Sequence, residues 1–148
     1  DRVYSMAGSR YVLTEFSAST EEKYIRDRIY ELLSSGYKPI VAHIERYKCM
    51  KDIELVEYLV NKGAYMQVNA DSVIGKNGHG VKKYCGKLLE DELVQFIGSD
   101  CHGSKRRVTR IGDAYAYVSK KFGCQAADEI FIDNPQEILD NAKHCLSL

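Results

Sequence analysis

The chain has 148 residues, 45% of them hydrophobic, with 21 Lys and Arg against 21 Asp and Glu. This length is enough for one domain with a sizeable core, and the balanced charge argues against nucleic acid or an anionic membrane as a partner. No apolar run approaches the ~20 residues that a membrane span needs, and the five cysteines include no C-x-x-C pair, so we expect a cytoplasmic protein with free thiols and no membrane insertion.

Short apolar runs alternate with amphipathic segments along the whole chain. In chain order, the predicted elements are a strand at 11–16, a helix at 21–33, a strand at 40–42, a helix at 53–60, a strand at 64–69, a helix at 84–89, a strand at 93–98, a helix at 111–122 and a helix at 134–139. Ser19 or Thr20 can cap the first helix, and Asp52 can cap the second. Strands that alternate with helices predict an α/β fold with parallel strands.

Polar residues stand where the predicted strands end. Glu15, His43, Asn69 and Asp100 follow one another at intervals of roughly one βα unit, about 30 residues. The carboxyl ends of parallel strands meet at one side of a sheet or barrel, and functional residues gather there. We therefore expect these four residues, together with His102, to project into one mouth.

Carboxylates and imidazoles are frequent among these strand-end residues. Asp100 and His102 are two apart, so in an extended chain they point to the same side and Cys101 points away. With Glu15 and His43 they form a set of oxygen and nitrogen ligands that suits manganese, iron or zinc.

Two arginines follow the histidines of this set. Arg46 comes three residues after His43, and Arg107 comes five residues after His102. The planar guanidinium group matches the oxygens of a phosphate. Metals that activate water, together with arginines that bind phosphate, predict a phosphoester hydrolase.

Each of these residues also has a plainer explanation when it is taken singly. A lone histidine at a strand end is more often structural than a ligand, and neighbouring arginines often lie in a solvated loop. The segment from Cys101 to Arg107 also fits C-x5-R, the phosphate loop of cysteine-dependent phosphatases, in which a thiolate attacks phosphorus. That motif is short, and Val108 follows its arginine where a hydroxyl residue is usual, so the coincidence across four strands favours the metal site.

Five segments, in order along the chain, resemble the protein-tyrosine phosphatases of bacterial capsule and exopolysaccharide loci, which belong to the PHP (polymerase and histidinol phosphatase) superfamily. They are Y-V-L-T-E-F at 11–16, H-I-E-R-Y at 43–47, M-Q-V-N-A at 66–70, G-S-D-C-H at 98–102 and N-P at 134–135. The resemblance implies a distorted (β/α)7 barrel, of which residues 1–148 form the C-terminal portion of a single domain. It also implies a manganese cluster and hydrolysis of phosphotyrosine on a cognate bacterial tyrosine kinase that controls polysaccharide synthesis.

The resemblance also implies roles for particular residues. By matching motif, the metal ligands are Glu15, His43, Asp100 and His102, and the phosphate-binding residues are Arg46 and Arg107. The family also has an H-x-H motif near its start, but no histidine precedes His43 in this chain. We therefore expect that the N-terminal part of a family-length chain is absent, that the metal cluster is incomplete, and that this chain alone has little activity.

Three functions remain open from the sequence. The chain can belong to a phosphotyrosine phosphatase, to another PHP-type phosphoesterase that acts on a small phosphate ester, or to a non-catalytic partial domain with an incomplete metal site. The H-I-E-R-Y motif with a basic S-D-x-H loop favours the first, and the missing H-x-H motif favours the third for the chain alone. We also expect self-association through the sheet edge that the missing strands would cover.

Overall fold

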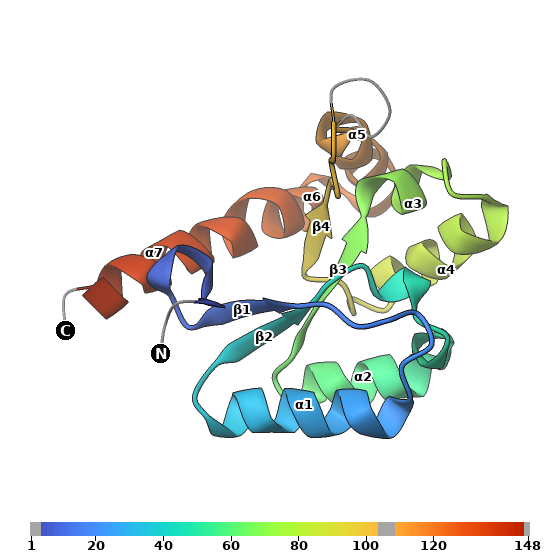
Figure 1. Cartoon of the computed structure of the whole chain (residues 1–148). Coiled ribbons are helices and arrows are strands. Elements are labelled where there is room, and N and C mark those ends of the chain that lie inside the picture. The colour runs from blue at the N-terminus through green and yellow to red at the C-terminus, as the bar shows by residue number, and fades with distance from the viewer. Residues whose placement is uncertain (1–3, 104–108, 147–148) are drawn as a thin grey trace.

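The computed structural model describes residues 4–103 and 109–146. Within these residues, parallel strands form one four-stranded sheet in the order β1-β2-β3-β4 (Figure 1). The strands are β1 Tyr11–Thr14, β2 Lys38–Val41, β3 Tyr65–Asn69 and β4 Phe96–Gly98. Because the order in space follows the order in the chain without a reversal, the sheet is wound like part of a barrel wall and has no topological switch point.

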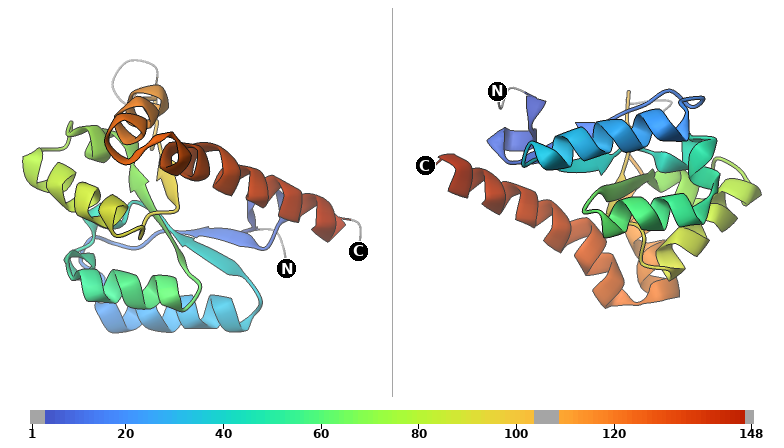
Figure 2. Two further views of the ribbon diagram at one scale, coloured as in Figure 1. Left: turned by 180° about the vertical axis from the view of Figure 1, so that it is seen from behind. Right: turned by 90° about the horizontal axis from the view of Figure 1, so that it is seen from below.

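Helices follow the strands, as the alternating sequence pattern predicts. They are α1 Glu22–Ser34, α2 Ile53–Asn61, α3 Ala70–Ile74, α4 His79–Glu90, α5 Ile111–Phe122, α6 Cys124–Asp128 and α7 Asn134–Leu146, with short turns η2 Met6–Gly8, η3 Ile44–Arg46, η4 Cys49–Lys51 and the π-helical turn η5 Glu129–Asp133. Both views in Figure 2 show α1 and α2 side by side along the sheet, while α7 runs away from them and passes beside η2. Within the described residues, no helix is long and apolar enough to cross a membrane.

The two faces of the sheet are covered unequally. Successive residues of a strand point to opposite faces, so each strand contributes to both. The helix-covered face holds the main core, in which side chains of α1 and α2 meet strand residues: Ile25, Ile29, Val56 and Leu59 against Val41, Met66 and Val68. The inner face has a smaller apolar cluster, formed by Tyr11, Ile40, Phe96 and Ile138. The four residues of this cluster are buried, in part by Ile138 of α7, whereas Leu13 on the same face of β1 is 53% exposed.

The predicted α/β fold is confirmed, and the differences are at the ends of elements and in short helices. The cap of α2 is confirmed, because an Asp52 carboxylate oxygen accepts a hydrogen bond from the Glu54 N–H at 3.0 Å. The expected cap of α1 by Ser19 or Thr20 is wrong, since the preceding residue is Glu21 and makes no side-chain cap bond. Helix α3 was not predicted, because its five residues are too few to show a helical period.

Candidate metal and phosphate site

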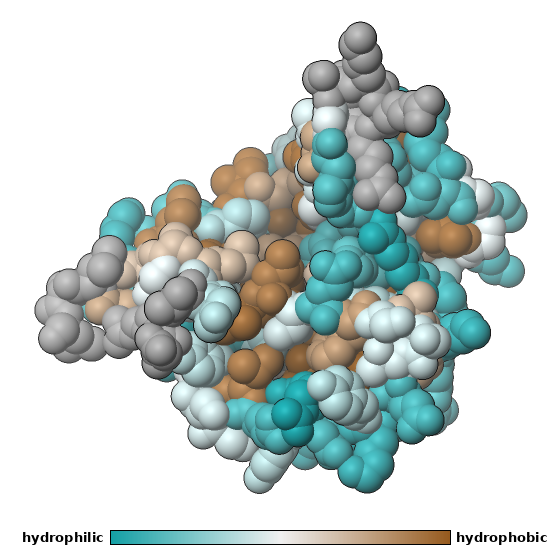
Figure 3. Space-filling model, viewed as in Figure 1, coloured by the Kyte–Doolittle hydropathy of each residue, from teal (hydrophilic) through white to brown (hydrophobic). Residues whose placement is uncertain are grey.

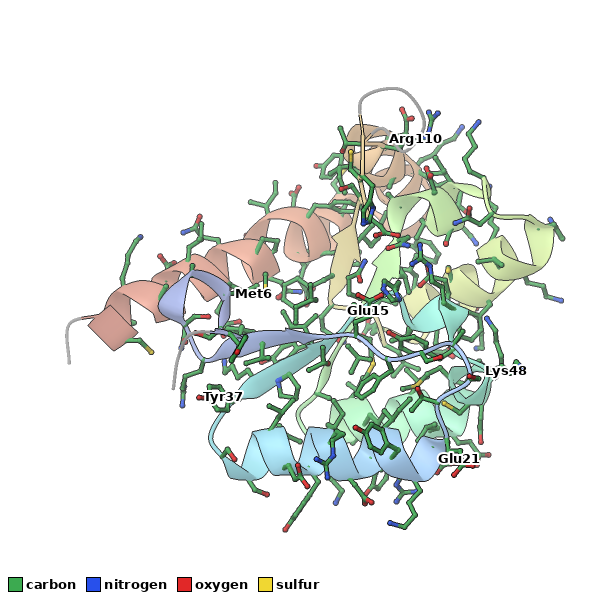
Figure 4. The ribbon with its side chains drawn as sticks, in the orientation of Figure 1. Met6, Glu15, Glu21, Tyr37, Lys48 and Arg110 are labelled. Carbon is green, nitrogen blue, oxygen red and sulfur yellow. The ribbon has the colours of Figure 1, made fainter. Side chains whose placement is uncertain are left out.

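The carboxyl ends of β1 and β2 bring together the first two predicted ligands. Glu15 directly follows β1 (Figure 4). Its Oε1 lies 2.9 Å from Nε2 of His43. The His43 side chain is 8% exposed, whereas that of Glu15 is 70% exposed. The imidazole is therefore fixed in the protein interior, and the carboxylate approaches it from the open side of the sheet.

A second pair follows β4. His102 Nδ1 lies 2.8 Å from the backbone carbonyl oxygen of Asp100 and 3.4 Å from its Oδ1. The Asp100 carboxylate also forms an ion pair with Arg46 and accepts a hydrogen bond from Asn69 Nδ2 at 3.3 Å. The arginine of the H-I-E-R-Y motif is thereby held against a predicted metal ligand.

Left-handed backbone conformations turn the chain at two of these strand ends. His43 has φ 37° and Asp100 has φ 47°, a region that non-glycine residues rarely adopt and that often marks functional sites. The expectation that Asp100, Cys101 and His102 continue as an extended strand is therefore wrong. Asp100 and His102 still meet, because the turn brings the His102 ring back to the Asp100 carbonyl.

One cavity of about 340 Å³ connects the strand ends with the inner face of the sheet. Three predicted ligands, Glu15, His43 and Asp100, line it, together with Gln67 and Asn69. The rest of its lining is mainly apolar: Met6, Leu13, Ile40, Ala42, Phe96, Ile97, Pro135 and Ile138. In the space-filling view, brown hydrophobic surface gathers between β1 and α7, and teal hydrophilic surface dominates towards α3 and the α5 end (Figure 3).

The donor types fit a divalent metal, but the ligand set is incomplete. Within the part of the chain that the structure describes, no group of three or more His, Cys, Asp or Glu residues is arranged to hold a metal ion. The four predicted ligands instead form two pairs, and the buried His43 Nδ1 has no hydrogen-bond partner in the described part of the chain. Carboxylate oxygen and imidazole nitrogen suit manganese, iron or zinc, so both pairs can contribute to a metal site that needs further ligands.

Arg107, the second predicted phosphate-binding residue, lies outside the described residues, as do Lys105 and Arg106. Arg46 is described, and it lines a small polar pocket with five other residues: Asn69, Asp71, Asn77, Ser99 and Asp100. Arg46 therefore stands beside the candidate metal ligands, where a phosphate group can reach it.

This chain matches the family of CpsB/CapC capsular polysaccharide synthesis proteins over residues 1–140. It belongs to that family. It is 36% identical over 137 residues to the tyrosine-protein phosphatase CpsB of Streptococcus pneumoniae, a match that covers 88% of this chain and 56% of that protein. It is 31% identical over 125 residues to the tyrosine-protein phosphatase YwqE of Bacillus subtilis, with coverage of 84% and 49%.

A structural match supports this assignment. The crystal structures of YwqE from Bacillus subtilis and CpsB from Streptococcus pneumoniae, described as unique metal-dependent tyrosine phosphatases, include a chain that this one matches with a TM-score of 0.75 at 30% identity. The match covers 97% of this chain and 55% of that chain. The resemblance to capsule-locus tyrosine phosphatases is thus confirmed, and the chain spans about half the length of the relatives it matches.

Cys101 is the nucleophile in the competing cysteine-dependent mechanism, but it does not line the cavity that holds Glu15, His43 and Asp100. Its thiol is exposed and donates to the Gly103 carbonyl oxygen at 3.5 Å. The C-x5-R hypothesis also needs Arg107, which lies outside the described residues. The described geometry gives Cys101 no base to activate it, and the family match favours metal-dependent chemistry.

Sequence reasoning assigned no role to Glu45 or Gln67, although both are buried polar residues of motifs that it quoted. Glu45 Oε1 accepts hydrogen bonds from the Asn69 N–H at 3.1 Å and from Ser72 Oγ at 2.7 Å. Gln67 Oε1 accepts one from the His43 N–H at 2.6 Å. The sequence did carry a signal for Gln67, which is a polar residue inside the otherwise apolar start of the strand M-Q-V-N.

Proposed function

We propose that this protein is a metal-dependent phosphatase that hydrolyses phosphotyrosine, with manganese as its metal. Its substrate in this proposal is a bacterial tyrosine kinase that controls capsule or exopolysaccharide synthesis. The observation that supports this most is the cavity of about 340 Å³ at the carboxyl ends of the strands, with Glu15, His43 and Asp100 in its wall and Arg46 paired to Asp100. The relatives' names support the substrate class and the pathway.

The described residues divide the work between metal and phosphate. In the proposal, Glu15 and His43 hold the metal from β1 and β2, and Asp100 and His102 hold it from the end of β4. A bound divalent metal supplies Lewis acidity and an activated water molecule. Arg46 exchanges its contact with Asp100 for two oxygens of the substrate phosphate, which its guanidinium group can bind in a bidentate manner.

In the proposal, Arg107 also binds the substrate phosphate, a role that rests on the motif match alone. The charge that develops on the phosphate oxygens in the transition state is stabilised by such fixed positive groups. Because the chain spans about half of its relatives and its two ligand pairs do not form a complete set, we expect little or no turnover from these 148 residues alone.

A fusion protein tests this proposal. The part of Streptococcus pneumoniae CpsB that this chain does not match is joined to it, and hydrolysis of a phosphotyrosine peptide and of a small phosphate ester is measured with and without Mn²⁺. We expect Mn²⁺-dependent hydrolysis that favours the phosphotyrosine peptide. His43→Ala should lower it to background, because it removes a buried ligand.

His79→Ala is the matched control, since His79 is an exposed histidine at the start of α4. It should leave the activity of the fusion unchanged. Equal hydrolysis without any metal would contradict the proposal, and a strong preference for the small ester would support another PHP-type phosphoesterase instead.

A further inference from the structure

Two amide side chains on β3 link the two halves of the candidate metal site. Gln67 Oε1 accepts a hydrogen bond from the His43 N–H at 2.6 Å, and Gln67 Nε2 donates to Asn69 Oδ1 at 3.1 Å. Asn69 Nδ2 then donates to Asp100 Oδ2 at 3.3 Å. The result is a continuous row of hydrogen bonds from the end of β2, across β3, to the end of β4.

The chemistry of its two ends fixes the direction of this row. A backbone N–H can only donate, so the oxygen of Gln67 must face His43, and its nitrogen must face Asn69. A carboxylate can only accept, so the nitrogen of Asn69 must face Asp100. Both amides are therefore held in one orientation, and Gln67 Nε2 donates a further bond to the Val68 carbonyl oxygen at 2.7 Å.

Gly98 on β4 provides an independent sign that the position of Gln67 matters. A Cβ atom at residue 98 would lie 2.7 Å from Gln67 Nε2, closer than real Cβ contacts allow. Gly98 does not have the positive φ that would itself require glycine. The glycine therefore leaves room for the Gln67 amide at the point where Asn69 and Gly98 are paired in the sheet.

We propose that Gln67, acting with Asn69, is a positioning residue that sets the relative placement of the metal ligands His43 and Asp100. This inference rests on the proposed metal-dependent function. His43 and Asp100 follow β2 and β4, which do not pair with each other, and the β3 side chains Gln67 and Asn69 bridge them in addition to the direct ion pair between Arg46 and Asp100. Both ligands also have left-handed backbones, and the amide row holds the His43 main chain and the Asp100 carboxylate in place.

The variant Gln67→Met tests the inference in the fusion protein with CpsB, in which the further ligands are present, because Met has a similar size and forms none of these hydrogen bonds. Mn²⁺ affinity is measured by electron paramagnetic resonance, and hydrogen exchange of the His43 amide is followed by NMR. We expect binding about 10-fold weaker or more, as is usual when a group that orients a metal ligand is lost, together with faster exchange at His43.

Gln95→Met is the matched control. The Gln95 side chain accepts a hydrogen bond from the Met66 N–H at 2.9 Å, at the end of the β3–β4 pair opposite the site. It should lower thermal stability much as Gln67→Met does, while Mn²⁺ affinity stays within twofold of wild type. Equal losses of Mn²⁺ affinity in both variants would show a merely structural role for Gln67 and overturn the inference.

A second pair of variants tests the contact with Gly98. Gly98→Ala should weaken Mn²⁺ binding in the wild-type background, but should have little further effect in Gln67→Ala, where no amide is displaced. Additive effects would overturn the inference. If wild type binds no Mn²⁺, the proposed metal site fails and this inference fails with it; if wild type binds and Gln67→Met binds equally well, only the inference fails.

Discussion

Glu45 is the buried carboxylate of the H-I-E-R-Y motif, between the candidate ligand His43 and the candidate phosphate-binding Arg46. One of its oxygens accepts hydrogen bonds from the Asn69 N–H and from the Ser72 hydroxyl. Its other oxygen is buried and has no hydrogen-bond partner among the residues that the structure describes. The hydrogen bonds of Glu45 therefore connect turn η3 to the junction of β3 and α3. They also help to position His43 and Arg46, which lie close to Glu45 in the sequence.

Replacement of Glu45 by Ala should destabilise the fold by about 2–3 kcal/mol, because a buried backbone N–H and a buried hydroxyl both lose their acceptor. Ser72→Ala removes only one of these bonds and should cost about 1 kcal/mol. Urea denaturation of both variants provides the measurement. A Glu45→Ala loss no larger than that of Ser72→Ala would show that the Asn69 contact contributes little.

The candidate site was predictable from the sequence where a carboxylate or imidazole residue stands at the end of a predicted strand. Glu15, His43 and Asp100 each follow an apolar run, and the structure brings all three to one cavity. Their role as ligands, and that of His102, stays a prediction. The bonds from Gln67 were not predictable, because they join three strands that are distant in the sequence and leave no periodic pattern.

A cluster of polar side chains joins α7 to the amino ends of β1 and β2. The Tyr11 hydroxyl donates to Glu137 Oε1 at 2.7 Å, and Lys38 Nζ donates to the same oxygen at 2.9 Å. The hydrogen bond from Tyr11, and then that from Lys38, holds the pKa of Glu137 below its ordinary value of 4.5. The ionised form of Glu137 is therefore the form that favours the folded state.

Glu137→Gln should lower the free energy of unfolding at pH 7 by up to about 1 kcal/mol, a modest value because half of the Glu137 side chain is exposed. Since its folded pKa is depressed, the wild-type advantage is complete above the unfolded value of 4.5 and shrinks as the pH falls through the folded value. Urea denaturation at pH 7 and below pH 4.5 measures the difference. A difference that stays constant over this range would contradict the account.

The order of strands and helices was predictable because apolar runs and amphipathic segments differ in period. Helix α5 begins and ends at 111 and 122 as expected, and β3 lies within the expected 64–69. Strand β4 is shorter than expected, since ladder pairing with β3 begins only at Phe96. The buried run of Leu93 and Val94 precedes it and packs in the main core without strand pairing, which composition alone does not reveal.

In the molecule as a whole, the inner face of the sheet carries an exposed apolar side chain at its β1 edge, in the lining of the mainly apolar cavity. Leu13 on β1 is half exposed, and β1 pairs on one side with β2 and has no strand on its other side within the described residues. An uncovered apolar face and a free strand edge both favour association with another chain.

We therefore expect the 148-residue chain to self-associate as its concentration rises. Leu13→Lys should weaken this association, because it places a charge on the exposed face of the edge strand. Sedimentation velocity over a wide concentration range measures both chains, with Leu139→Lys on the exposed surface of α7 as control. A wild-type chain that stays monomeric at the highest concentration would contradict this expectation.

We propose that this family member uses metal-activated water and not a cysteine nucleophile. The most direct measurement compares hydrolysis of a phosphotyrosine peptide by the fusion protein with CpsB after chelation and after Cys101→Ser. We expect the chelator to abolish hydrolysis and Mn²⁺ to restore it, since the metal supplies the activated water. Cys101→Ser should retain most of the activity, because the Cys101 thiol lies outside the cavity. Full activity in the chelator, with an inactive Cys101→Ser variant, would contradict the account.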